Sequence, residues 1–125
     1  MHGTLDTAGF TTRRSRSAGS DERKQWTAAL GSDPARLTDT SATRLVRAAG
    51  KGADVPPTLT VFRGGPLRQR IEKGYATALR AAGTPVTLVD ATSLTHDQVN
   101  RNIGAPGDQV MTAPLVRFLS ACFAP

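Results

Sequence analysis

His96, one of the chain's two histidines, stands in a segment suited to acid–base chemistry. It lies within residues 94–104, shortly after the apolar and β-branched residues 86–90. An imidazole whose unperturbed pKa is about 6.5 takes up and releases a proton near neutral pH. His96 is therefore our candidate general base. Such a base needs a hydroxyl or thiol to activate, and the rest of the sequence offers no obvious nucleophile.

A strand–helix–strand pattern precedes this histidine and would position it. Residues 58–62 are β-branched and largely apolar, and they lie between paired prolines and paired glycines, which is typical of a buried strand. Residues 86–89 predict a second buried strand. Between the strands, residues 66–82 predict a helix, whose apolar side chains recur at helical spacing (Leu67, Ile71, Tyr75, Ala78, Leu79 and Ala82). Because such crossovers join parallel strands, we expect an α/β unit with a short parallel sheet and flanking helices.

The remaining segments also predict helices, but the helical pattern is clear in one of them and weak in the others. Residues 111–122 predict a closing helix that faces the sheet with four side chains (Leu115, Phe118, Leu119 and Cys122). Residues 1–55 are weakly patterned, and short helices are expected over 21–30 and 42–49. We therefore divide the chain into residues 1–55, a helical and loop segment, and residues 56–125, an α/β unit.

Two glycines predict where helices end. Gly83 follows the helix predicted over residues 66–82, and Gly104 follows the short helix expected after His96. Glycine adopts a positive φ without steric cost and is common just past the end of a helix. We therefore expect both glycines to have a left-handed backbone.

The candidate site lies at one edge of the predicted sheet. In an open parallel sheet, functional groups gather beyond the carboxyl ends of the strands. Three segments follow predicted strands here: Asp6 after a strand ending at Leu5, residues 63–65, and residues 90–96. We expect these three segments to converge.

The strong positive charge raises a different function. A net charge of +6 and a pI near 10.7 fit a nucleic-acid-binding protein. However, basic residues are spread along the whole chain, aromatic residues for base stacking are few, and arginine outnumbers lysine 13 to 3. A GC-rich coding sequence produces the same bias. We keep nucleic-acid binding as an alternative, since positive charge alone gives only salt-sensitive, non-specific attraction.

Other classes of site and location are disfavoured. Cys122 is the only cysteine, which excludes an internal disulfide and a cysteine-built zinc site. We expect no metal and no cofactor. There is no long apolar run for a membrane span and no apolar stretch at the N-terminus for a signal peptide, so we expect a cytoplasmic protein.

Several motifs in this order resemble the C-terminal part of α/β-hydrolases of the carboxylesterase and lipase type. They are PPTLTVF at residues 56–62, ATALRAAGTPVTLV at 76–89, SLTHDQVN at 93–100 and APGDQVMTAPLVRFLSACF at 105–123. The resemblance covers roughly the last 70 residues. It implies a partial α/β-hydrolase fold whose complete form hydrolyses a carboxylic ester.

The resemblance also implies roles for individual residues. In that family, the histidine after the last strand is the base of a Ser-His-Asp/Glu triad, and His96 occupies that position. The serine belongs to a G-x-S-x-G elbow, which this sequence lacks. Residues 63–65, where the acid commonly stands, contain no carboxylate, so Asp6 is the proposed substitute. Asp90, at the end of a predicted strand, is more typical of a residue that orders a loop.

The simplest hypothesis is a C-terminal fragment of an esterase-like hydrolase that is inactive alone. A small ester is then the substrate of the complete enzyme. The alternatives are a non-catalytic remnant or interaction module, and the basic nucleic-acid binder. A short sheet with an open edge also exposes unpaired backbone groups. We therefore expect an isolated chain that is poorly folded or self-associates through that edge.

Overall fold

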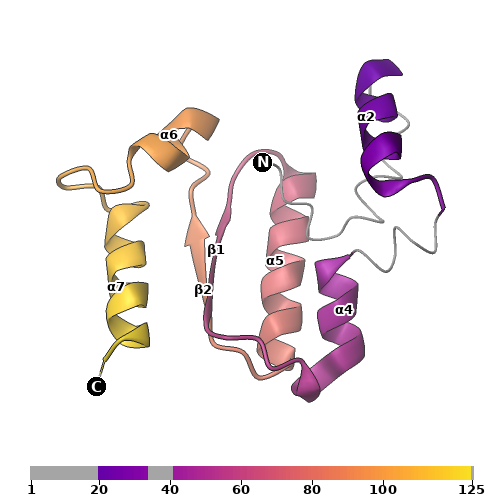
Figure 1. The fold of residues 1–125 in the computed structure, drawn as a ribbon. Helices are drawn as coiled ribbons and strands as arrows, with labels where there is room; N and C mark the ends of the chain where they lie inside the picture. Colours follow the sequence, from indigo (N-terminus) through magenta and orange to yellow (C-terminus); the bar gives the residue numbers. More distant parts are fainter. Residues whose placement is uncertain (1–19, 34–40, 125) are drawn as a thin grey trace.

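The computed structural model describes residues 20–33 and 41–124 (Figure 1). Along the chain its elements are α2 (Ser20–Leu30), α4 (Ala42–Ala49), the 3₁₀ helix η1 (Gly50–Gly52), β1 (Thr58–Phe62), α5 (Pro66–Ala81), β2 (Val86–Asp90), α6 (His96–Arg101) and α7 (Thr112–Cys122). The predicted helices and strands are confirmed to within one or two residues at their ends. The strand expected to end at Leu5 lies outside the described residues.

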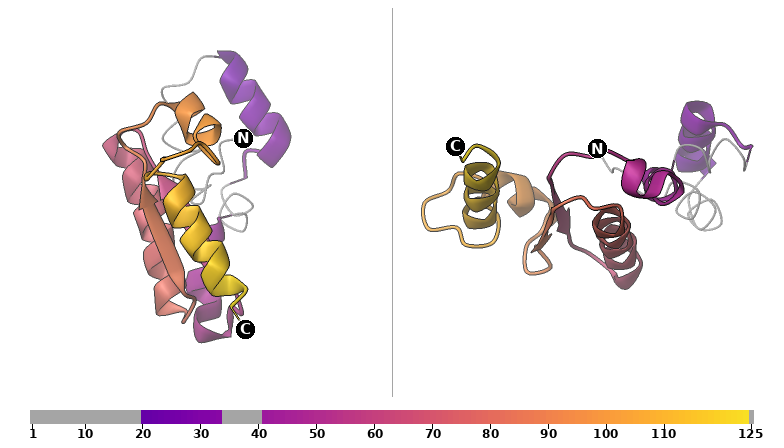
Figure 2. Two further views of the ribbon diagram at one scale, coloured as in Figure 1. Left: turned by 90° about the vertical axis from the view of Figure 1, so that its left-hand side faces the viewer. Right: turned by 90° about the horizontal axis from the view of Figure 1, so that it is seen from below.

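A two-stranded parallel sheet forms the centre of the described fold. β1 pairs with β2 in a register that runs from Thr58 opposite Val86 to Phe62 opposite Asp90. α5 connects the two strands, so the predicted parallel crossover is confirmed. α5 and α4 lie on one side of the sheet, and α6 and α7 lie on the other (Figures 1 and 2). The described part of the chain is therefore a small α/β unit.

One of two apolar clusters in the described residues joins α4 to α5. Val46 of α4 packs with Ala78, Leu79 and Ala82, and the side chain of Leu79 is completely buried. Ala76, which lies outside the predicted stripe of α5, is also completely buried. Small side chains dominate this cluster, so the two helices can lie close together.

The second cluster lies between the sheet and the α6–α7 segment. Val89, Ala91 and Met111 are buried there, and half-buried apolar side chains surround them (Leu59, Val61, Leu94, Val99 and Val110). The strands occur where they were predicted, but they are less buried than expected. In a sheet of two strands each strand has an edge, so most of its side chains are only half-covered.

α7 packs with a narrower face than the sequence suggests. Leu115 and Phe118 are half-buried as expected, whereas Leu119 is 43% exposed and Cys122 is exposed. The prediction that the sheet covers Leu119 is therefore wrong, whereas Cys122, although exposed, lines a groove between α7 and the strands. The physical cause for Leu119 is the width of the sheet, because α7 contacts β2 and two strands cover only part of a helix surface.

The start of α7 is fixed by Asp108, which the sequence analysis did not identify. Its carboxylate accepts hydrogen bonds from the backbone amides of Met111 at 2.9 Å and Thr112 at 2.6 Å, and from that of Val110 at 3.3 Å. These bonds, above all the one from Thr112, hold the pKa of Asp108 below its usual value. The carboxylate thereby satisfies amides that have no partner inside the helix.

The glycine prediction is confirmed for backbone conformation at both positions. Gly83 has φ of 90° and Gly104 has φ of 84°. After α5, the amides of Gly83 and Thr84 donate to the carbonyls of Arg80 and Leu79, which is the Schellman arrangement at a helix end. Gly104 differs, because α6 ends at Arg101 and the glycine belongs to the following turn.

Replacing Gly83 with alanine should destabilise the fold by about 1 kcal/mol. A Cβ there meets no atom within 4 Å, so the cost comes from the positive φ alone. Gly74 is the matched control, since it lies inside α5 and also has free space around it. Gly74→Ala should stabilise by roughly 0.5–1 kcal/mol. Urea unfolding of both variants checks the opposite signs, and a shift of the same sign in both would contradict this helix end.

Glu72 of α5 is a partly buried carboxyl group that should make stability depend on pH. Thr60 of β1 donates to Glu72 Oε2 at 3.2 Å. Burial raises the pKa of Glu72, although the hydrogen bond from Thr60 and the charge of Arg68 lower it in part. The folded state therefore binds a proton more tightly than the unfolded state does. As a result, this group lowers stability as the pH rises from about 4.5 through its folded pKa.

Glu72→Gln should remove this dependence. We expect the variant to be more stable than the wild type at pH 7 and equally stable at pH 4, because glutamine keeps an acceptor for Thr60 without the charge. Urea unfolding at both pH values measures the difference. Glu72→Gln that is less stable than the wild type at pH 7 would show that the ionised carboxylate stabilises the fold.

Candidate active site

The candidate site lies where the two strands end. β1 and β2 finish side by side at Phe62 and Asp90, and the β2 arrow points toward α6 (Figure 1). The amide of Ala91 donates to the carbonyl of Phe62 at 2.9 Å, so the pairing of the two strands continues for one more residue. Residues 63–65 and 90–96 therefore both begin at the carboxyl end of the sheet, as predicted.

His96 is the first residue of α6 and its side chain is exposed. The sequence predicts a short helix that begins after His96, whereas the observed helix already includes His96 as its first residue. The helix start is held by a capping box. The amide of Gln98 donates to Thr95 Oγ1 at 3.3 Å, and the amide of Thr95 donates to Gln98 Oε1 at 2.8 Å. These two bonds fix the backbone that carries the imidazole.

Asp90 orders the loop before His96. Its Oδ1 accepts from the hydroxyl of Thr92 at 2.6 Å and from the Thr92 amide at 2.9 Å. The hydroxyl bond and then the amide bond hold the pKa of Asp90 below its usual value. This is the loop-ordering role expected for an aspartate at the end of a strand. Both bonds converge on one oxygen of the carboxylate.

Arg63 joins the two loops of the candidate site, and the sequence analysis did not assign it a role. Its Nε donates to the carbonyl of Leu94 at 3.1 Å, which links the end of β1 to the segment that carries His96. Nearby, the Lys73 ammonium lies 4.4 Å from the centre of the Phe62 ring. An arginine directly after a strand is a weak signal, because its partner is a backbone carbonyl that no sequence pattern reveals.

The proposed acid Asp6 lies outside the described residues, as do Leu5 and the third segment expected at this edge. The described residues thus place His96, Arg63 and Asp90 at or just beyond the carboxyl ends of the two strands. An exposed imidazole with a fixed backbone can transfer protons once a nucleophile and a carbonyl substrate come within about 3 Å of it.

A concave surface of the described chain lies at the other end of the strands. A groove of about 460 Å³ lies between α7 and the amino ends of β1 and β2. Its lining is mostly apolar, with three polar side chains (Thr87, Arg117 and Cys122). Because His96 follows the carboxyl end of β2, this groove is separate from the candidate site.

Within residues 20–33 and 41–124, no three His, Cys, Asp or Glu side chains are grouped so that they could hold a metal ion. In the same residues, no helix has the length and apolar character needed to cross a membrane.

Comparisons of this chain with protein-family models, with curated proteins and with solved structures found no match.

Proposed function

We propose that residues 56–124 are the C-terminal part of an esterase-like α/β-hydrolase, in which His96 is the catalytic base. The observation that carries this proposal is the position of His96. It follows the second of two parallel strands joined by a helical crossover, at the carboxyl end where such sheets carry their functional groups. The motif order of residues 56–123 supports the same family.

The proposed reaction is acyl transfer from a carboxylic ester. His96 takes the proton of a serine hydroxyl as its oxygen attacks the ester carbonyl, and then gives that proton to the departing alcohol. Water repeats the cycle and releases the acid. The serine comes from a polypeptide other than these 125 residues, since they contain no G-x-S-x-G elbow.

The proposed acid partner is Asp6, with Asp90 in a different role. Asp90 already accepts two hydrogen bonds from Thr92, so it holds the loop in shape. Residues 63–65, which directly follow β1, contain no carboxylate. A carboxylate that accepts from the imidazole would keep the ring in the orientation and tautomer that the base needs.

Reconstitution with the missing part tests the proposal. The chain is co-expressed with the polypeptide encoded immediately upstream, and hydrolysis of p-nitrophenyl butyrate is measured. We expect His96→Ala to lower kcat by at least about 10³-fold, because a triad acts as a unit. His2→Ala, the same change at the other histidine, is the control and should leave the rate unchanged.

Three outcomes would count against the proposal or part of it. An upstream polypeptide without a nucleophile elbow, or a reconstituted rate that does not depend on His96, would contradict the hydrolase assignment. A reconstituted rate that is lost in His96→Ala but kept in Asp6→Asn would retain the base and remove Asp6 as the acid.

A further inference from the structure

The groove at the amino ends of the strands has walls made by regular elements. One wall is a single side of α7, since its residues recur at helical spacing: Pro114, Arg117, Phe118, Ala121 and Cys122. The other wall comes from the starts of the two strands: Pro57, Pro85, Val86 and Thr87. Three of these residues are prolines, whose φ is fixed. The volume of about 460 Å³ lies in the range of roughly 300–1,000 Å³ that is typical of small-molecule sites.

Two polar side chains of this groove have no partner among the described residues. Neither the guanidinium of Arg117 nor the hydroxyl of the half-buried Thr87 makes a hydrogen bond or an ion pair there. The lining contains no aspartate or glutamate. A second guanidinium lies close to the groove, since Arg80 Nη2 donates to the carbonyl of Val86 at 3.3 Å. The groove is therefore mostly apolar, and its charge is positive.

We propose that this groove binds a small carboxylic acid with an apolar body. The apolar lining accepts the body, and the guanidinium of Arg117 pairs with the carboxylate. An ionised carboxylate only accepts hydrogen bonds, so it suits two donors, a guanidinium and a hydroxyl. The one cation of the lining matches a single negative charge.

The charge of Arg117 also argues against a purely apolar occupant. An apolar surface that closed over the groove would take this guanidinium out of water and give it no counter-charge, which is costly. An acid with an apolar body supplies both the apolar contact and the counter-charge. This site is independent of the proposed hydrolase, because it lies at the opposite end of the strands from His96. His96→Ala should therefore bind the acid like the wild type.

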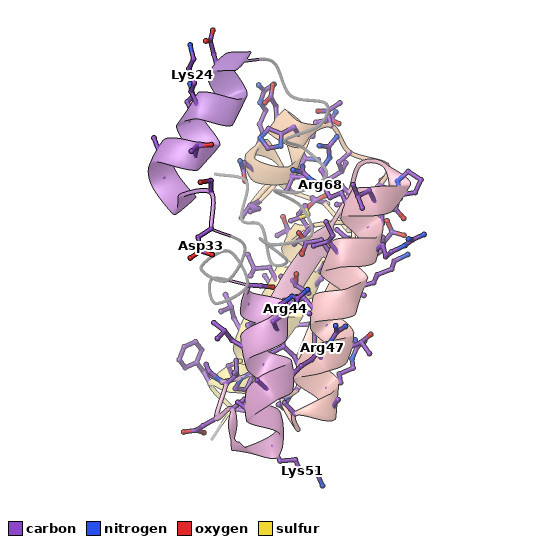
Figure 3. All side chains as sticks on the ribbon, turned by 90° about the vertical axis from the view of Figure 1, so that its right-hand side faces the viewer. Lys24, Asp33, Arg44, Arg47, Lys51 and Arg68 are labelled. Carbon is purple, nitrogen blue, oxygen red and sulfur yellow. The ribbon has the colours of Figure 1, made fainter. Side chains whose placement is uncertain are left out.

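Isothermal titration calorimetry with 4-phenylbutyrate and with its neutral amide tests the proposal on the 125-residue chain. We expect the acid to bind saturably and the amide to bind at least about fivefold more weakly, because only the acid forms a charge-assisted pair. Arg117→Gln should remove this preference for the acid. Arg44→Gln is the matched control and should keep it, because Arg44 lies on α4, on the opposite side of the sheet from α7 (Figures 2 and 3).

Cys122 reports where the acid binds. It is the only cysteine, it is exposed, and it lines the groove. Alkylation of its thiol by iodoacetamide should slow down over the same concentrations of 4-phenylbutyrate that saturate the calorimetric signal. Ala121→Phe fills the groove and should abolish binding of the acid and of the amide. Ala121 and Arg117 are both exposed, so these substitutions carry little risk to the fold, and far-UV circular dichroism verifies that each variant remains folded.

A wild type that shows no saturable binding of 4-phenylbutyrate would overturn the inference. So would equal binding of the acid and the amide, a preference that Arg44→Gln removes as completely as Arg117→Gln does, or saturation that leaves the alkylation of Cys122 unchanged. A thiol that becomes protected as the protein concentration rises, without any ligand, would show that a second copy of the chain covers the groove instead.

Discussion

The 125-residue chain alone should hydrolyse p-nitrophenyl butyrate no faster than buffer does, within the error of a multiple-turnover assay. Neutral imidazole activates a hydroxyl only when that hydroxyl lies within about 3 Å in the right direction. An α/β-hydrolase ensures this with a serine on a strained turn next to the histidine loop. No G-x-S-x-G turn exists in this sequence, so His96 has no such serine to activate.

The isolated chain should also lack the residual rate that an oxyanion hole and a substrate pocket provide. When a complete hydrolase loses one triad member, its oxyanion hole and substrate pocket still accelerate the reaction about 10³–10⁴-fold over water. In the proposed hydrolase those elements lie outside these 125 residues, so we expect not even that residual rate. Turnover by the purified chain that disappears in His96→Ala but persists in His2→Ala would contradict this expectation. It would mean that a nucleophile lies within these residues.

The elements of the fold could be predicted because their signals are local. β1 is a β-branched run between prolines and glycines, and α4 has the bounds expected from its sequence. The carboxyl-end position of His96 follows from the same local signals, since a helical crossover between two strands makes them parallel. Fold class and the place of the candidate base were therefore accessible without coordinates.

Burial and side-chain partners could not be predicted in the same way. Whether Leu119 is covered depends on how many strands lie under α7, which is a property of the whole sheet. The bond from Arg63 to the Leu94 carbonyl joins residues that are 31 positions apart. By contrast, the capping box of Thr95 and Gln98 is a sequence signal that was present and overlooked.

Leu79→Ala should be the most damaging single substitution in the described core. Leu79 is completely buried and contacts the cluster that joins α4 to α5. Truncating a buried leucine costs about 2–5 kcal/mol, because transfer energy is lost and a cavity remains. A small domain is stable by only about 5–15 kcal/mol in total, and this core is built largely of alanine and valine. We therefore expect a much lower urea concentration at the unfolding midpoint, or a chain that is unfolded at room temperature without urea.

Leu45→Ala is the matched control for this prediction. Leu45 lies on α4, in the same helix pair, but its side chain is 54% exposed and alanine is a better helix former. Its free energy of unfolding should change by less than about 0.5 kcal/mol. Equal losses in the two variants would mean that Leu79 is not buried in solution. An intact urea midpoint in Leu79→Ala would mean that the α4–α5 cluster contributes little and that the sheet and α7 hold the fold together.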